Sequence, residues 1–158
     1  MENITFGSIY DDRLKDAKKL LFKVLPKLKD NSYNIKGYKF SSVTEVRDDG
    51  VTICAYTMVN NYGDKYIVVN NKFQKESLEA LASLIAHELT HVLDKPTVDE
   101  EVEAYTNEAL AWNKLKNDKI KPSELTEILN HVLELCRQGE IRNYVVNSGF
   151  YQDNLGLN

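Results

Sequence analysis

The spacing of apolar residues divides the chain into helical stretches and one extended stretch. Apolar residues recur three and four positions apart from Ser8 to about Leu28, from Ser77 to Asp94 and from Ser123 to about Gln138, which predicts amphipathic helices. From Ile35 to Asn71 the period is two, as in a half-buried strand. We therefore expect an α+β fold in which helices pack on a small sheet.

Two turn signals divide the extended stretch. Asp48-Asp49-Gly50 is typical of a hairpin, and Asn60–Asp64 is rich in turn-forming residues. They predict a small antiparallel sheet of three strands, or of four if Val43–Arg47 forms a short strand of its own. The expected strands are a first around Tyr38–Phe40, a second at Thr52–Val59 and a third at Tyr66–Val69.

Capping residues and prolines give the expected ends of the first two helices. Ser8 with Asp11 resembles an N-terminal cap, and Pro26 ends or bends the last turn of the first helix. Ser77 is the expected cap of the second helix, and Pro96 follows its end.

Two more helices complete the expected fold. Thr97 with Glu100 fits a capping box, so we expect a helix from Thr97 to about Lys116. The C-terminal helix follows Pro122 and stops at Gly139.

Composition limits the kind of protein. The length of 158 residues suits a single domain over residues 1–158, and 42% hydrophobic with 28% charged residues is an ordinary globular balance. The net charge is −4 without a long basic run, so we set nucleic-acid binding aside. No stretch has the apolar length of a membrane span or the pattern of a signal peptide. Nothing in the sequence requires Cys54 and Cys136 to pair, so the default expectation is a soluble cytoplasmic protein with reduced thiols.

The candidate metal-binding and catalytic residues lie in one segment, His87-Glu88-Leu89-Thr90-His91. It has the pattern H-E-x-x-H and contains two of the chain's three histidines. On a helix, His87 and His91 lie one turn apart on one face and can fill two corners of a tetrahedral zinc site. The side chain of Glu88 points away from the helix face that carries the two histidines. From there it can reach a water bound to the metal and serve as the general base of a zinc hydrolase. Apolar residues surround the motif, so the helix should be buried, where both imidazoles need partners.

A third ligand is expected from the helix that begins at Thr97, because its first turns are acidic. The helix dipole alone favours some of these acids. Glu101 is flanked by the apolar side of the helix and Glu103 by its polar side, so Glu101 is the preferred ligand, Glu103 the alternative and Glu100 the third choice. The acids of these turns are Asp99, Glu100, Glu101 and Glu103.

H-E-x-x-H on one helix, followed by a glutamate on the next, resembles the gluzincin branch of the zinc metallopeptidases. The run Glu101-Val-Glu-Ala104 is similar to the E-x-E-A segment of small bacterial and phage-associated members, the minigluzincins and ImmA-like proteases, in which the first glutamate is the ligand. The resemblance covers about residues 66–115. The metzincin pattern would need glycine and histidine where this chain has Asp94 and Thr97.

The chain departs from the gluzincin pattern in two ways. The gap between His91 and Glu101 is short for this family. The position four residues after Glu101, often Asp or Asn in relatives, is Tyr105. If Glu103 were the ligand, the corresponding position would be Asn107, which matches better, so Glu103 stays open as the ligand.

The resemblance implies a zincin-like fold and a zinc-dependent metallopeptidase that acts on a protein or peptide substrate. Zn²⁺ would then be held by His87, His91 and Glu101, with Glu88 as the general base. An edge strand of the sheet would line the cleft and bind substrate as an added strand, and the third strand is one candidate for that edge. The oxyanion donor is open among Tyr105, Tyr144 and Tyr151.

Two other interpretations stay open. In one, zinc is structural and a catalytically silent domain binds a partner protein, which requires a fourth protein ligand. In the other, no metal binds and the motif arose by chance. The aromatic C-terminal tail either packs on the body or, from about Asn147 onward, lies over the cleft, and His131 is expected at the surface without a role.

Overall fold

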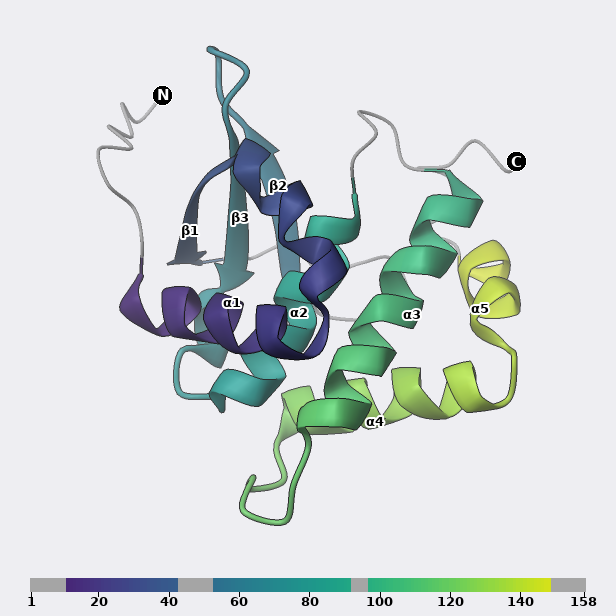
Figure 1. Cartoon of the computed structure of the whole chain (residues 1–158). Helices are drawn as coiled ribbons and strands as arrows, with labels where there is room; N and C mark the ends of the chain where they lie inside the picture. Colours follow the sequence, from purple (N-terminus) through teal and green to yellow (C-terminus); the bar gives the residue numbers. More distant parts are fainter. Residues whose placement is uncertain (1–10, 43–52, 92–96, 149–158) are drawn as a thin grey trace.

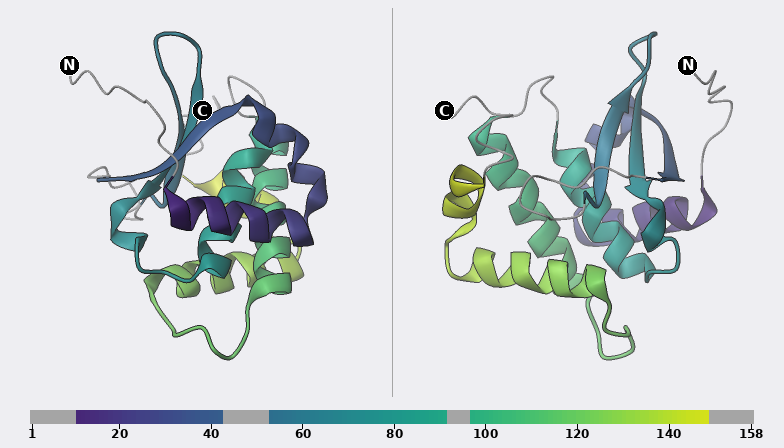
Figure 2. Two further views of the ribbon diagram at one scale, coloured as in Figure 1. Left: turned by 60° about the vertical axis from the view of Figure 1, so that its left-hand side comes forward. Right: turned by 180° about the vertical axis from the view of Figure 1, so that it is seen from behind.

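The computed structural model describes residues 11–42, 53–91 and 97–148. Helix α2 lies between the sheet and helix α3, with α1 beside it (Figures 1 and 2). Helix α5 lies on the far side of α3, and α4 runs across the end of α3 and also contacts α2. The expected α+β fold is confirmed, and none of the helices in these residues is long and apolar enough to span a membrane. The elements are α1 (Asp12–Val24), η1 (Pro26–Leu28), η2 (Asp30–Asn34), β1 (Ile35–Ser41), β2 (Ala55–Val59), β3 (Lys65–Asn70), η3 (Asn71–Phe73), α2 (Leu78–Thr90), α3 (Val98–Leu115), α4 (Glu124–Arg137) and α5 (Ile141–Asn147).

Helix α1 is shorter than the apolar spacing predicts. Asp11 is its N-cap, and Asp11 Oδ1 accepts hydrogen bonds from the backbone N–H groups of the second and third helical residues. The helix ends at Val24, because Leu25 leaves the helical conformation (φ −131°, ψ 71°), which the following proline disfavours. Pro26 then begins the 3₁₀-helix η1. Ser8, the other proposed cap residue, lies outside the described residues.

The sheet is mixed, and this corrects the expected antiparallel meander. The strand order is β1-β3-β2, and β3 pairs parallel with β1 and antiparallel with β2. The third strand is therefore central, and its proposed position at the edge is wrong. All residues from Tyr66 to Asn70 are buried, as expected for a strand that is covered on both faces. The parallel pair of β1 and β3 is not a direct connection, because β2 comes between these two strands in the sequence.

The two turns that were expected to shape the sheet have different outcomes. The turn between β2 and β3 is confirmed: the Asn60 N–H donates to the carbonyl of Asp64 over 2.9 Å, and Gly63 has φ +81°. The first turn signal, Asp48–Gly50, and the short strand proposed at Val43–Arg47 lie outside the described residues.

Helix α2 carries the H-E-x-x-H motif through the centre of the molecule. Every residue from Ala80 to Thr90 is buried, because α1, α3 and the sheet surround the helix. The helix ends before Asp94, its expected end, and His91 is its C-cap with φ −74° and ψ 105°. The side-chain amide of Asn31 donates to the carbonyl of Leu89 over 2.8 Å, which satisfies one of the last helical carbonyls.

Helix α3 begins and ends where the sequence predicts. Thr97 is its N-cap, with Oγ1 accepting from the backbone N–H of Glu100 over 3.1 Å. Farther along, the buried Asn107 donates from Nδ2 to Oγ1 of Thr90 on α2 over 2.9 Å. This bond joins the helix of the motif to the helix of the proposed third ligand.

The C-terminal part contains one helix that the sequence did not predict. Helix α4 begins with a capping box, in which Ser123 is the N-cap and Thr126 the third helical residue, and Gly139, at φ +70°, follows its end. Helix α5 then packs on α3 and α4 through the buried residues Ile141 and Val145. The beginning of the tail therefore packs on the body, while residues 149–158 lie outside the described part of the chain.

Candidate metal centre

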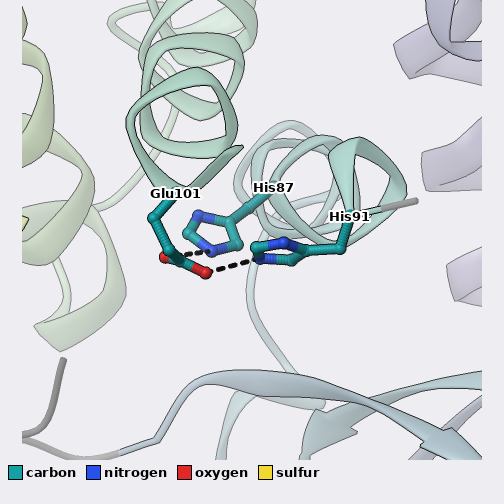
Figure 3. Close-up of side chains that lie close together, drawn as sticks. All are labelled: His87, His91 and Glu101. Atoms are coloured by element: carbon teal, nitrogen blue, oxygen red, sulfur yellow. Dashed lines mark ion pairs between the residues drawn. The ribbon is translucent and has the colours of Figure 1, made fainter. Parts of the chain in front are cut away.

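Three side chains converge between α2 and α3. His87 and His91 extend from neighbouring turns of the motif, and Glu101 faces them from the first turn of α3 (Figure 3). Glu101 Oε1 lies 2.8 Å from His91 Nε2, and Glu101 Oε2 lies 3.7 Å from His87 Nε2. One ligand atom from each residue falls within 4.8 Å of the other two, so the cluster can hold a metal ion.

The other nitrogen of each ring also faces a carboxylate. His91 Nδ1 lies 2.9 Å from Glu100 Oε1, and His87 Nδ1 lies 3.4 Å from Glu108 Oε1. Both of these glutamates are buried, and both belong to α3. Each imidazole therefore lies between Glu101 on its Nε2 side and a second carboxylate on its Nδ1 side.

Burial and neighbouring charges shift the pKa values of this cluster. Burial opposes a charge on His87, but Glu108, Glu101 and Glu88 outweigh it and raise the pKa of His87 to about 9. Burial also opposes a charge on His91, and the bond to Glu101 raises the pKa above its ordinary value. Burial raises the pKa of Glu108, against the opposing effect of His87. In the metal-free protein, the site therefore favours bound protons.

The donor set fits a divalent metal ion. A neutral imidazole carries one N–H and one lone pair, so it can donate to only one of the two carboxylates that enclose it. A second proton on each ring resolves this conflict in the metal-free protein. A cation held by the two rings and Glu101 would resolve it as well, because each Nε2 lone pair could face the metal while each Nδ1–H faces Glu100 or Glu108. Two imidazole nitrogens and a carboxylate are ligands that zinc and related ions accept.

Glu88 lies beside the cluster and is held from the sheet. Its side chain is buried, and Thr57 Oγ1 of strand β2 donates to Glu88 Oε2 over 3.0 Å. Its charge contributes to the raised pKa values of His87 and His91. The carboxylate is thus close enough to act on the two rings electrostatically.

The structure separates the three glutamates that the sequence left as candidate ligands. Glu101 is 4% exposed and joins the histidines, whereas Glu103 is exposed on the outer side of α3. Glu100 is buried, but its carboxylate meets His91 at Nδ1 rather than at Nε2. Asn107, which would have supported Glu103 as the ligand, bonds to Thr90 instead.

The proposed oxyanion donors and the third histidine also have defined positions. The ring of Tyr105 packs edge-on against His87, with 4.5 Å between centroids. Tyr144 packs in turn on Tyr105 at 5.5 Å, and Tyr151 lies outside the described residues. His131 is exposed, as expected, and its ring lies 6.2 Å from that of Tyr144.

Two residues of the site were missed in the sequence. Glu108 follows Glu101 by seven positions, so it lies two turns on along the same face of α3, and the neighbouring Ala104, Ala109 and Trp112 are buried. The spacing of seven residues could therefore have indicated that Glu108 lies near the site. The sequence around Thr57 contains no such indication, because threonine is common in strands whether or not it contacts a catalytic group.

Comparisons with known proteins add nothing to these observations: the chain matches no family model, no curated protein and no solved structure.

Proposed function

We propose that this protein is a zinc-dependent metallopeptidase. The observation that carries the proposal is the convergence of His87, His91 and Glu101, with the carboxylate of Glu88 beside them. The gluzincin resemblance of the sequence points to the same residues and roles. The substrate class is a protein or peptide.

The number of ligands favours catalysis over a structural zinc. Within residues 11–42, 53–91 and 97–148, the metal-binding group has three members, His87, His91 and Glu101. Catalytic zinc sites have three protein ligands and keep one position open, whereas structural sites have four. Two imidazoles with one carboxylate are a ligand set of catalytic zinc.

Glu88 is the proposed general base. Bound zinc would supply Lewis acidity, which acidifies water and polarises the substrate carbonyl. Thr57 holds one carboxylate oxygen of Glu88, Oε2, and so fixes the direction of the side chain. The other oxygen, Oε1, would then be available to take a proton from the attacking water and to pass it to the leaving amine nitrogen.

Strand β2 is the proposed docking edge for the substrate. It lies at one edge of the three described strands, and its Thr57 contacts Glu88. An extended peptide that adds to β2 through backbone hydrogen bonds would lie along the strand that also holds the base. This assigns to β2 the role that the sequence had offered to the third strand.

The decisive test compares Glu88→Gln with the wild-type protein, both loaded with zinc. A complex peptide library is incubated with each, and cleavage products are identified by mass spectrometry. We expect cleavage by the wild-type protein, full zinc binding by both, and loss of cleavage in Glu88→Gln. Glu103→Gln is the matched control, since it removes an exposed carboxylate and should cleave normally.

Two results would refute the proposal. If Glu88→Gln cleaves as fast as the wild-type protein, Glu88 is not the base. If the zinc-loaded wild-type protein cleaves nothing while it holds its metal tightly, the interpretation as a catalytically silent zinc domain replaces the enzyme.

A further inference from the structure

Helix α3 supplies a carboxylate to both ring nitrogens of each histidine. Glu101 faces both Nε2 atoms, while its neighbour Glu100 reaches His91 Nδ1 and Glu108 reaches His87 Nδ1. The three glutamates come from one helix, and all are at most 6% exposed.

Burying three carboxylates costs free energy unless each of them interacts with one of the imidazole rings. Carboxylates are seldom fully buried without a partner, because losing water disfavours their charge. Among the described residues, neither Glu108 Oε2 nor His87 Nδ1 has a hydrogen-bond partner, and the ion pair of 3.4 Å between Glu108 Oε1 and His87 Nδ1 is the polar contact that holds this side chain. Helix stability does not require a carboxylate here, since Glu108 lies in the second half of α3, beyond the reach of the N-terminal dipole.

We propose that Glu100 and Glu108 are positioning residues of the metal centre. Each accepts the Nδ1–H of one ligand ring, which fixes the tautomer and turns the Nε2 lone pair toward the metal. This inference rests on the metal centre of the proposed function, but it does not depend on peptidase activity. It gives α3 a double role, because the helix provides both the third ligand and the groups that orient the first two.

Metal affinity tests the inference directly. Binding of Zn²⁺ is measured by competition with a chromophoric chelator for the wild-type protein, Glu100→Met and Glu108→Met. Methionine keeps the length of the side chain and removes the carboxylate, and it is a good helix former. We expect each variant to bind Zn²⁺ about 10- to 100-fold more weakly.

Two further variants separate positioning from a general effect of charge. Glu108→Gln should bind Zn²⁺ with an intermediate affinity, because its amide oxygen still accepts the Nδ1–H but carries no charge. Glu103→Met removes a carboxylate from the exposed side of the same helix and should leave the affinity unchanged. Thermal unfolding of each metal-free variant shows that it is folded before binding is compared.

The wild-type protein alone provides a second readout, which needs no variant to fold. Long-range proton–nitrogen NMR of the imidazoles distinguishes a protonated nitrogen from one that is bound to metal. In the Zn²⁺-loaded protein, we expect His87 and His91 to carry a proton on Nδ1 and to bind metal through Nε2. Coordination through Nδ1 of either ring would overturn the inference.

The outcomes distinguish this inference from the proposed function. Wild-type affinity in both methionine variants would overturn the positioning role and leave the peptidase proposal intact. Weaker binding in both, together with the expected NMR signals but without any peptide cleavage, would support the positioning role and refute the peptidase. A wild-type protein that binds no Zn²⁺ would overturn both.

Discussion

Thr57 Oγ1 on strand β2 donates a hydrogen bond of 3.0 Å to Oε2 of Glu88 on helix α2. The bond links the edge of the sheet to the glutamate of the H-E-x-x-H motif, two elements that are remote in sequence. If β2 binds the substrate and Glu88 transfers the proton, this hydrogen bond fixes the position of the base relative to the strand that holds the peptide.

Replacing Thr57 by valine should lower turnover without removing the metal. Valine keeps the shape of the side chain but cannot donate, so Glu88 is free to rotate away from its position. A hydrogen bond to a charged group contributes about 1.5–3 kcal/mol, which corresponds to a loss in kcat of roughly 10- to 100-fold. Turnover is measured on a peptide that the wild-type protein cleaves, together with zinc content.

Thr57→Ser is the matched control, because serine keeps the hydroxyl donor. It should retain most of the activity that valine loses. Equal rates in the wild-type and valine proteins would show that the hydrogen bond does not position the base.

The metal-free protein should become less stable as the pH rises from about 6.5 to about 9. The pKa of His87 is raised from its ordinary 6.5 to about 9 in the folded state, so the fold binds this proton more tightly than the unfolded chain does. The stabilising contribution is complete below pH 6.5 and is lost as the pH rises through 9. The raised pKa of Glu108 adds a loss of the same sign, which begins as the pH rises above the ordinary value of 4.5. One proton changes the free energy of unfolding by at most about 1.4 kcal/mol per pH unit.

Urea unfolding at a series of pH values, with a chelator present, measures this slope. His87→Gln should flatten it, whereas replacing the exposed His131 by glutamine should leave it unchanged. A stability that stays level or rises across this window in the wild-type protein would contradict the prediction.

Removing the side-chain amide of Asn107 should destabilise the packing of α2 against α3. Asn107 donates to Thr90 in a buried position, so alanine leaves both a lost hydrogen bond and a small cavity. We expect Asn107→Ala to lower the free energy of unfolding by about 1–3 kcal/mol. Asn113→Ala, on the exposed side of the same helix, should change it far less. Chemical denaturation compares the two, and equal losses would rule out a special role for this bond.

Local sequence patterns predicted the parts of this site that depend on a single helix. The apolar spacing around His87 indicated a buried helix, and the cap at Thr97 located the start of α3. The apolar neighbours of Glu101 favoured it over Glu103, and the structure places Glu101 against the histidines and Glu103 in solvent. These features follow from helical periodicity and capping, which a sequence displays directly.

Features that depend on distant partners were not predictable in the same way. The order β1-β3-β2 is decided by which strands pair, and a turn signal between β1 and β2 favoured the wrong neighbour. The unbroken apolar run Tyr66–Val69 is typical of a strand that is buried on both faces, but the prediction of the strand order did not use it. Thr57 and Glu88 meet only because α2 packs on β2, a contact that neither local pattern contains.

Zinc stoichiometry is the most direct test of the central claim, that His87, His91 and Glu101 form a metal centre. Elemental analysis is carried out on the purified wild-type protein, Glu101→Ala and Glu103→Ala after zinc loading and desalting. We predict about one zinc per chain in the wild-type protein and in Glu103→Ala, and loss of zinc in Glu101→Ala, because a catalytic site has three protein ligands. No zinc in any of the three, or full zinc in Glu101→Ala, would contradict the claim.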